Sequence, residues 1–143
     1  MENIISRIQD GIRNITFITT IQIILMIGLT TYSFASNSKI QGFSAMKSQT
    51  HFVEQLPYMF LHYYLHSNIL HLLTNGIALL FFGTAIERRI GSTKYLFFFL
   101  LHSLIEPLIM ISLYSLHLYD GNTVIGMSGY IFALFMINYY QPH

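Results

Sequence analysis

The sequence predicts an all-α membrane protein whose helices cross the bilayer several times. Hydrophobic residues make up 53% of its 143 residues and charged residues only 9%, against about 25% charged in soluble domains. The mean hydropathy is +0.52, and apolar segments of about 20 residues, the length that spans a bilayer, recur along the chain. We therefore predict one helical membrane domain, residues 15–143. Its predicted spans are residues 15–35, 58–86, 95–118 and 123–140.

The first predicted span, residues 15–35, is an uncharged stretch of 21 residues. Arg7 and Arg13 precede it, as basic residues precede the apolar core of a cleaved signal peptide. Because the stretch is long for a signal peptide, we predict a retained helix that follows a short cytoplasmic N-terminus, residues 1–14.

The second predicted span lies within residues 55–86, a stretch of 32 residues without Asp, Glu, Lys or Arg. This stretch is longer than one crossing requires. Pro57 is compatible with the first turn of a helix, so we expect the helix to occupy residues 58–86. The charged residues 87–94 then form a turn.

The third and fourth predicted spans, residues 95–118 and 123–140, are separated by a turn signal at residues 119–122. Glu106, followed by Pro107, interrupts the third span. A carboxyl group at membrane depth is a functional hypothesis in its own right. The alternative is a protonated, hydrogen-bonded Glu beside a proline kink.

Lysine and arginine are unevenly distributed among the loops. Residues 1–14 contain two and residues 87–94 contain three, whereas residues 119–122 contain none. The positive-inside rule therefore predicts a cytoplasmic N-terminus and a cytoplasmic 87–94 turn, with the fourth helix starting near the opposite face. A net charge of +1 provides no electrostatic basis for binding nucleic acid. The lack of cysteine excludes disulfides and zinc–thiolate sites.

The second span carries a polar motif from His66 to Asn75. His71 and Asn75 are four residues apart and share one helical face. Both side chains can donate hydrogen bonds, and donors aimed at one point would form an oxyanion site. The alternative is contact between helices, worth roughly 0.6 kcal/mol in a bilayer.

A second motif, residues 126–129, places Ser128 between two glycines at the fourth span. Glycines in membrane helices usually mark close packing. Small residues occur on both the second and the fourth predicted helices, so we expect these helices to touch. That contact would bring Ser128 toward His71 and Asn75.

In this order the motifs resemble those of the rhomboid intramembrane serine proteases, over about residues 56–140. The resemblance implies a helical fold with a water-filled cavity, in which Ser128 is the nucleophile. His71 and Asn75 would stabilise the oxyanion together with the backbone N–H of Ser128. The remaining matches are the cavity residues His66, Gly126, Gly129 and Phe132, and the structural residues Glu87 and Gly91.

The sequence departs from the family pattern in one respect. The minimal family fold has six helices, and its general base is a histidine in the sixth, within Ala-His-x-x-Gly; this sequence has four predicted spans and no such motif. A hydroxyl without a base is a poor nucleophile at neutral pH. His143 lies 15 residues after Ser128, about 22 Å along a helix, and His71 would have to leave the oxyanion role. The chain is therefore either a fragment of an active protease or a short rhomboid-like pseudoenzyme.

The resemblance implies an intramembrane serine endopeptidase that cleaves transmembrane substrates in a lipid bilayer. The alternative is a non-catalytic protein that binds membrane helices, and a weaker one is a proton-coupled carrier that uses Glu106. No cofactor is implied. His62 and His66 are four residues apart, but a zinc site needs a third protein ligand, so no metal is predicted.

Overall fold

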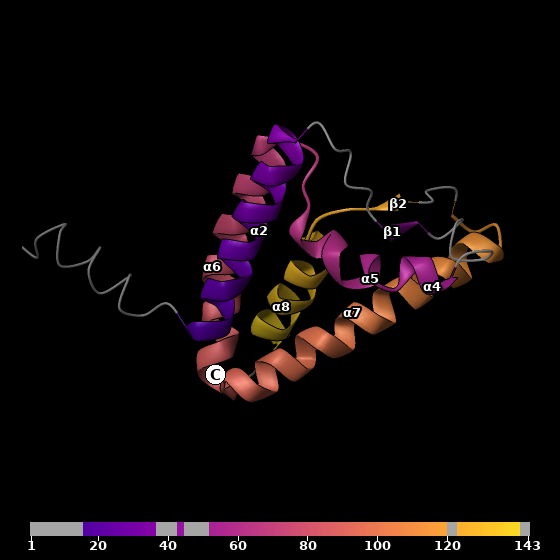
Figure 1. Ribbon diagram of the computed structural model, residues 1–143. Helices are drawn as coiled ribbons and strands as arrows, with labels where there is room; N and C mark the ends of the chain where they lie inside the picture. Colours follow the sequence, from indigo (N-terminus) through magenta and orange to yellow (C-terminus); the bar gives the residue numbers. More distant parts are fainter. Residues whose placement is uncertain (1–15, 37–42, 45–51, 120–122, 141–143) are drawn as a thin grey trace, which may run out of the picture.

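The computed structural model describes residues 16–36, 43–44, 52–119 and 123–140 (Figure 1). The predicted N-terminal segment 1–14 and His143 lie outside the described residues. The longer helices are α2 (Phe17–Ala35), α6 (Ile69–Ile90), α7 (Ser92–Ser115) and α8 (Ser128–Tyr140). The short elements are α4 (Phe52–Gln55), α5 (Tyr58–Leu61), the 3-10 helix η1 (His62–Tyr64), and the strands β1 (Phe43–Ser44) and β2 (Thr123–Val124).

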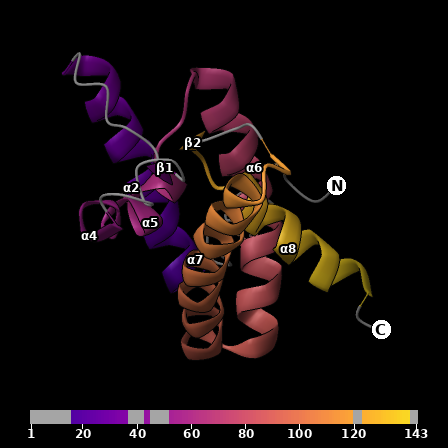
Figure 2. The ribbon, with the colours of Figure 1, turned by 90° about the vertical axis from the view of Figure 1, so that its right-hand side faces the viewer.

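Three helices, α2, α6 and α7, are long and apolar enough to cross a membrane. Helix α2 packs along α6, and α8 packs against α6 on another side (Figures 1 and 2). Polar backbone at membrane depth must be satisfied within the protein, which helices achieve internally. The predicted helical membrane fold is confirmed, and the chain is an integral membrane protein.

The second predicted helix, residues 58–86, differs most from the structure. Helix α6 begins only at Ile69, because Asn68 caps it by accepting a hydrogen bond from the His71 backbone N–H at 2.8 Å. The residues before Asn68 form α5 and η1 and then run extended at Leu65. The stretch without formal charge therefore contains two separate structural parts, and the prediction of one continuous helix was wrong.

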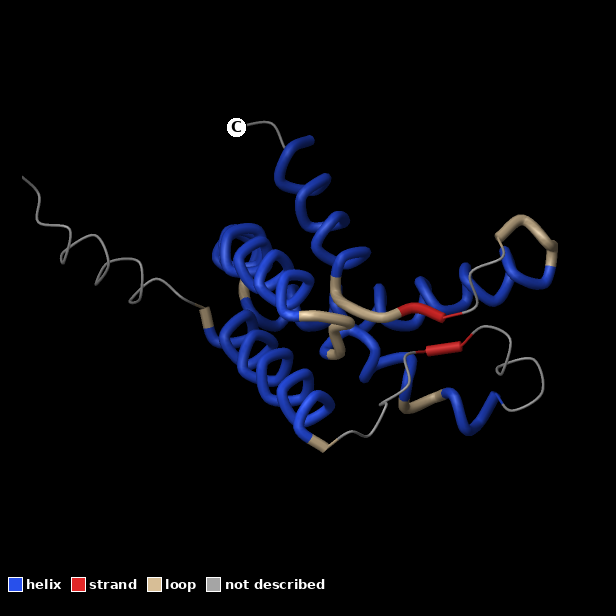
Figure 3. Tube along the Cα trace, turned by 90° about the horizontal axis from the view of Figure 1, so that it is seen from above, coloured by secondary structure: helices blue, strands red, loops and turns tan. Residues whose placement is uncertain are grey.

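The boundaries of the last two helices also shift. Helix α7 begins and ends three residues earlier than predicted, at Ser92 and Ser115. Helix α8 begins at Ser128 rather than at residue 123, because Thr123–Val124 pairs antiparallel with Phe43–Ser44. Figure 3 shows these two short strands side by side.

Glu87 joins the start of α2 to the turn between α6 and α7. Its buried carboxylate accepts hydrogen bonds from the N–H groups of Ile18 and Thr19, at 2.9 and 2.8 Å. The hydroxyls of Thr19 and Ser92 donate to it at 2.7 and 2.6 Å. Gly91 ends α6 with φ of 85°, a conformation that favours glycine. The two bonds from Ile18 and Thr19 satisfy N–H groups in the first turn of α2, which have no acceptor within their own helix.

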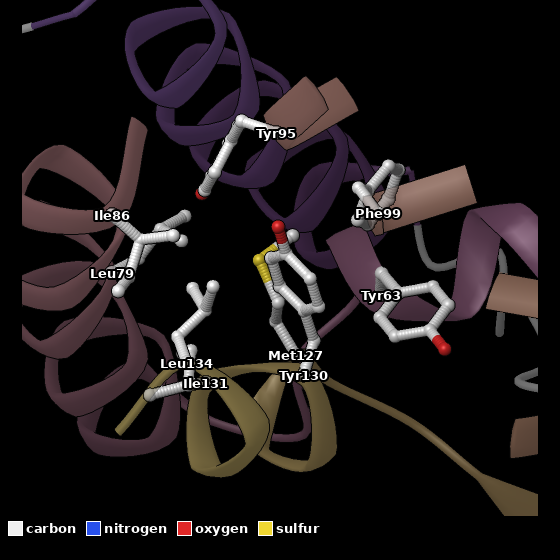
Figure 4. Close-up of a cluster of buried hydrophobic side chains, with 9 residues drawn as sticks. All are labelled: Tyr63, Leu79, Ile86, Tyr95, Phe99, Met127, Tyr130, Ile131 and Leu134. Atoms are coloured by element: carbon white, nitrogen blue, oxygen red, sulfur yellow. The ribbon is translucent and has the colours of Figure 1, made fainter. Parts of the chain in front are cut away.

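The core lies where α6, α7 and α8 meet η1 (Figure 4). Met127, directly before α8, and Tyr130 and Leu134 within it point toward α6 and α7, and all three are fully buried. Their burial fixes the rotation of α8 about its own axis and so fixes the side on which Ser128 lies. The cluster consists of Tyr63, Leu79, Ile86, Tyr95, Phe99, Met127, Tyr130, Ile131 and Leu134.

Candidate active site

The segment that leads into α8 lies directly on the polar face of α6. Gly126 has φ of 94°, and a Cβ atom built there would lie 2.6 Å from His71 Cε1 and 3.4 Å from Asn75 Nδ2. From its other side, the Gly126 N–H donates to the His62 carbonyl at 2.7 Å. Glycine is required here both for the positive φ and for the close approach to His71.

Ser128 is the first residue of α8, two residues after Gly126, and its side chain is exposed. The helix is opened by the bond from the Ile131 N–H to the Met127 carbonyl, at 2.9 Å. N–H groups of the first turn have no acceptor within their own helix, and the helix dipole favours negative charge at this end. The backbone around Ser128 can therefore stabilise an anion.

Asn75 is held by the buried His66. The amide nitrogen Nδ2 of Asn75 lies 2.9 Å from His66 Nε2. The Thr30 hydroxyl donates to the Tyr64 carbonyl at 2.9 Å, so its oxygen is free to accept from His66 Nδ1 at 3.2 Å. A neutral His66 with its proton on Nδ1 then accepts from Asn75 through Nε2. This arrangement fixes the orientation of the Asn75 amide and leaves its second N–H for the Gly126 side.

Burial keeps His66 neutral at physiological pH. It lowers the pKa of His66 to about 4, with a smaller effect in the same direction from His71 and an opposing one from the Tyr64 carbonyl. The ring centroids of His66 and His71 are 4.8 Å apart, edge to face. His66 lies behind Asn75 with 3% of its surface exposed, so its role in the structure is to support the donor.

His71 presents one edge of its ring to Gly126 and is partly exposed. Its other nitrogen, Nδ1, lies 3.4 Å from the Ser67 hydroxyl. The structure thus brings His71, Asn75 and the segment that carries Ser128 together on one side of α6. Two side-chain donors and a helix N-terminus converging near a serine can stabilise the oxyanion of an acyl-transfer reaction.

The other two predicted cavity residues, Phe132 and Gly129, lie on α8. Phe132, one turn after Ser128, is 62% exposed, and its ring centroid is 6.2 Å from that of Phe135. Gly129 faces the opposite way, toward α7, where a Cβ atom would collide with the carboxylate of Glu106.

A group of polar residues behind Ser128 was not predicted as a unit. Tyr63 donates its hydroxyl proton to Glu106 Oε2 at 2.5 Å. His102 Nδ1 and His62 Nε2 lie 3.5 and 3.9 Å from the same oxygen. The sequence holds one signal for it, since His102 and Glu106 are four residues apart and so share a helical face. Its other two members, His62 and Tyr63, come from η1, a short turn that hydrophobic periodicity does not predict.

The remaining histidines do not form a metal site within the described parts of the chain. His117, at the end of α7, is exposed and has φ of 56°. Among the residues that the structure describes, no group of three His, Asp or Glu side chains could hold a metal ion. His62 and His66 instead make the contacts with Glu106 and Asn75 described above.

A comparison with families of known proteins finds one match. The model of the rhomboid domain matches residues 53–141, well over half of the chain. No curated protein matches the sequence. The matched region runs from α4 to the end of α8 and includes His66, His71, Asn75 and Ser128.

Proposed function

Since the chain belongs to the rhomboid family, we propose that it supplies the nucleophile and the oxyanion site of an intramembrane serine endopeptidase. The observation that carries this proposal is the close approach of His71 and Asn75 to residue 126, two residues before Ser128, where a Cβ atom would lie 2.6 Å from His71 Cε1 and 3.4 Å from Asn75 Nδ2. A protein that only packed helices together would not need two hydrogen-bond donors aimed at the residues next to a serine.

In this mechanism the Ser128 oxygen attacks the carbonyl carbon of a peptide bond and loses its proton to a general base. The oxyanion that forms accepts hydrogen bonds from His71, from Asn75 and from the Ser128 N–H. The base then protonates the leaving amine as the peptide bond breaks, and water hydrolyses the acyl-enzyme. Each oxyanion donor of this kind contributes on the order of 3–4 kcal/mol to the transition state. Family members carry the base in Ala-His-x-x-Gly, a motif that these 143 residues do not contain.

The proposed orientation places Ser128 near the face of the membrane opposite the cytoplasm. His71 and the segment carrying Ser128 lie at the start of α6, whereas Arg88 and Arg89 lie at its end. Basic residues favour the cytoplasmic side, so cleavage would occur close to the other surface. Transmembrane substrates with small or helix-breaking residues there would unwind most easily into the site.

A second candidate function, binding of membrane helices without cleavage, is favoured by one observation. A groove of about 480 Å³ runs between α2 and α6, and its lining is almost entirely apolar. Such a surface can hold an apolar helix whether or not Ser128 reacts. The lining residues are Ile23, Met26, Ile27, Thr31, Ile69, Leu72, Leu73, Gly76, Ile77 and Leu80.

Labelling with a fluorophosphonate separates the two functions. An activated serine attacks the phosphorus and displaces fluoride. Because these 143 residues contain no Ala-His-x-x-Gly motif, hydroxide must accept the serine proton, so the purified protein in detergent micelles should be labelled at Ser128 at alkaline pH. Ser128→Ala should abolish labelling. Ser112→Ala is the matched control, because Ser112 is an exposed α7 serine that donates to the Leu108 carbonyl. Equal signal from wild type and Ser128→Ala would contradict the protease proposal and leave the binding function.

A further inference from the structure

Four titratable side chains gather behind the segment that carries Ser128. They are His62 and Tyr63 of η1 and His102 and Glu106 of α7, here called the Glu106 cluster. Glu106 Oε2 is its centre, 2.5 Å from the Tyr63 hydroxyl, 3.5 Å from His102 Nδ1 and 3.9 Å from His62 Nε2. The function proposed above uses none of these side chains.

The hydrogen bonds of the Glu106 cluster run toward the carboxylate. The single proton of the Tyr63 hydroxyl is donated to Glu106, so the Tyr63 oxygen accepts from His102 Nδ1 at 3.0 Å. His62 Nδ1 donates to the Tyr58 carbonyl at 2.8 Å, because a carbonyl oxygen only accepts. Glu106 is thus the final acceptor of the chain of bonds.

Glu106 also touches the backbone beside Ser128. A Cβ atom on Gly129 would collide with Oε1 of Glu106 and lie 3.1 Å from its Cδ atom. On the opposite side of the same segment, Gly126 touches His71. Because of these two glycines, residues 126–129 lie between the hydrogen-bond donors on α6, His71 and Asn75, and the Glu106 carboxylate on α7. Ser128 lies between the two contacts.

We propose that Glu106 is a positioning residue for Ser128, holding the 126–129 segment against α6 and setting the cost of negative charge at residue 128. This proposal rests on the proposed function, because it concerns the charge that develops when Ser128 reacts. Like charges close together repel each other. An ionised Glu106 therefore raises the cost of an anion on its own side of Ser128.

The titratable neighbours of Glu106 are histidines and tyrosines. The titratable groups that face it are His62 and Tyr63 from η1 and His102 from its own helix. Tyr130 of α8 faces the cluster through His102, with ring centroids 5.4 Å apart. Among these described residues, Glu106 is the one carboxylic acid.

The charge is tested with a thiol in place of the serine. The sequence contains no cysteine, so Ser128→Cys creates a single thiolate whose alkylation by iodoacetamide can be followed against pH. Adding Glu106→Gln, which keeps the shape but removes the charge, should lower the pH of half-maximal alkylation by about one unit. Glu54→Gln is the matched control, since it removes an exposed carboxylate on α4, and it should leave the curve unchanged. An unchanged curve with Glu106→Gln would overturn the charge effect.

The contact is tested by rescue. Gly129→Ala should lower the temperature of unfolding because its Cβ collides with Glu106, and adding Glu106→Ala should restore most of the loss. Additive losses in the double variant would overturn the contact, since uncoupled sites add. Neither measurement requires catalysis. If fluorophosphonate fails to label the wild-type protein, while Glu106→Gln still shifts the alkylation curve of the Ser128→Cys variant, the protease proposal alone is contradicted.

Discussion

Replacing Glu87 by alanine should lower the free energy of unfolding by about 4 kcal/mol. The structure gives Glu87 four hydrogen bonds and leaves 1% of its surface exposed. Two of the donors, the N–H and the hydroxyl of Thr19, are themselves buried. A buried donor left without an acceptor costs about 1–3 kcal/mol, so the two Thr19 donors alone account for the expected loss. Ile18 is partly buried and Ser92 is exposed, so we expect their donors to add less to the loss.

The assay is unfolding by SDS, followed by the helical circular dichroism signal of the protein in micelles. Glu87→Gln should lose less, because its amide oxygen still accepts one or two of the bonds. Glu54→Ala removes an exposed carboxylate on α4 and should change stability by less than about 0.5 kcal/mol. A loss below about 1 kcal/mol for Glu87→Ala would refute the conclusion that this carboxylate joins α2 to the α6–α7 turn.

Three further predictions concern the candidate site and the residue that supports it. The depressed pKa of His66, about 4 when folded, means that the unfolded chain binds its proton first, so stability should fall as pH drops from 6.5 toward 4; in urea titrations across this window His66→Gln should show a weaker dependence. Asn75→Ala should lower the rate of fluorophosphonate labelling about 10²-fold by removing an oxyanion donor, whereas an unchanged rate would exclude Asn75 from the site. Gly126→Ala should abolish labelling and reduce thermal stability, since its φ of 94° and the 2.6 Å approach to His71 exclude a Cβ atom; wild-type behaviour in both assays would contradict the observed loop.

The long helices were predictable because their signal is local. Long apolar runs identify α2 and α7 to within three residues, even though Glu106 interrupts the second of these runs. The break before α6 was missed because residues 55–86 remain free of formal charge through two different structures. Asn68 held the missing information, since Asn directly before an apolar helical run is a helix-start signal.

The two halves of the candidate site differ in the same way. The pairing of His71 with Asn75 follows from a spacing of four residues on one helix, and the structure places both beside Gly126. The contact between Tyr63 and Glu106 joins residues 43 apart in the sequence, and it depends on η1, a turn that hydrophobic periodicity does not detect. Local rules therefore predict the donors of the site, and only the tertiary structure reveals the carboxylate behind it.

The two proposals together determine the direction from which a substrate must approach. Donors on α6 stabilise negative charge on one side of Ser128, and Glu106 on α7 opposes it on the other. The carbonyl oxygen of a scissile bond must therefore point toward His71 and Asn75 when Ser128 attacks. A substrate bound with its carbonyl toward α7 would lose both donors and place its oxyanion next to a carboxylate. Because residues 126 and 129 are glycines, the donors on α6 and the carboxylate on α7 lie close enough to the segment to determine the direction of the carbonyl. Asn75→Ala and Glu106→Gln should consequently change the rate of labelling in opposite directions, and changes in the same direction would contradict the opposed effects of the α6 donors and the α7 carboxylate.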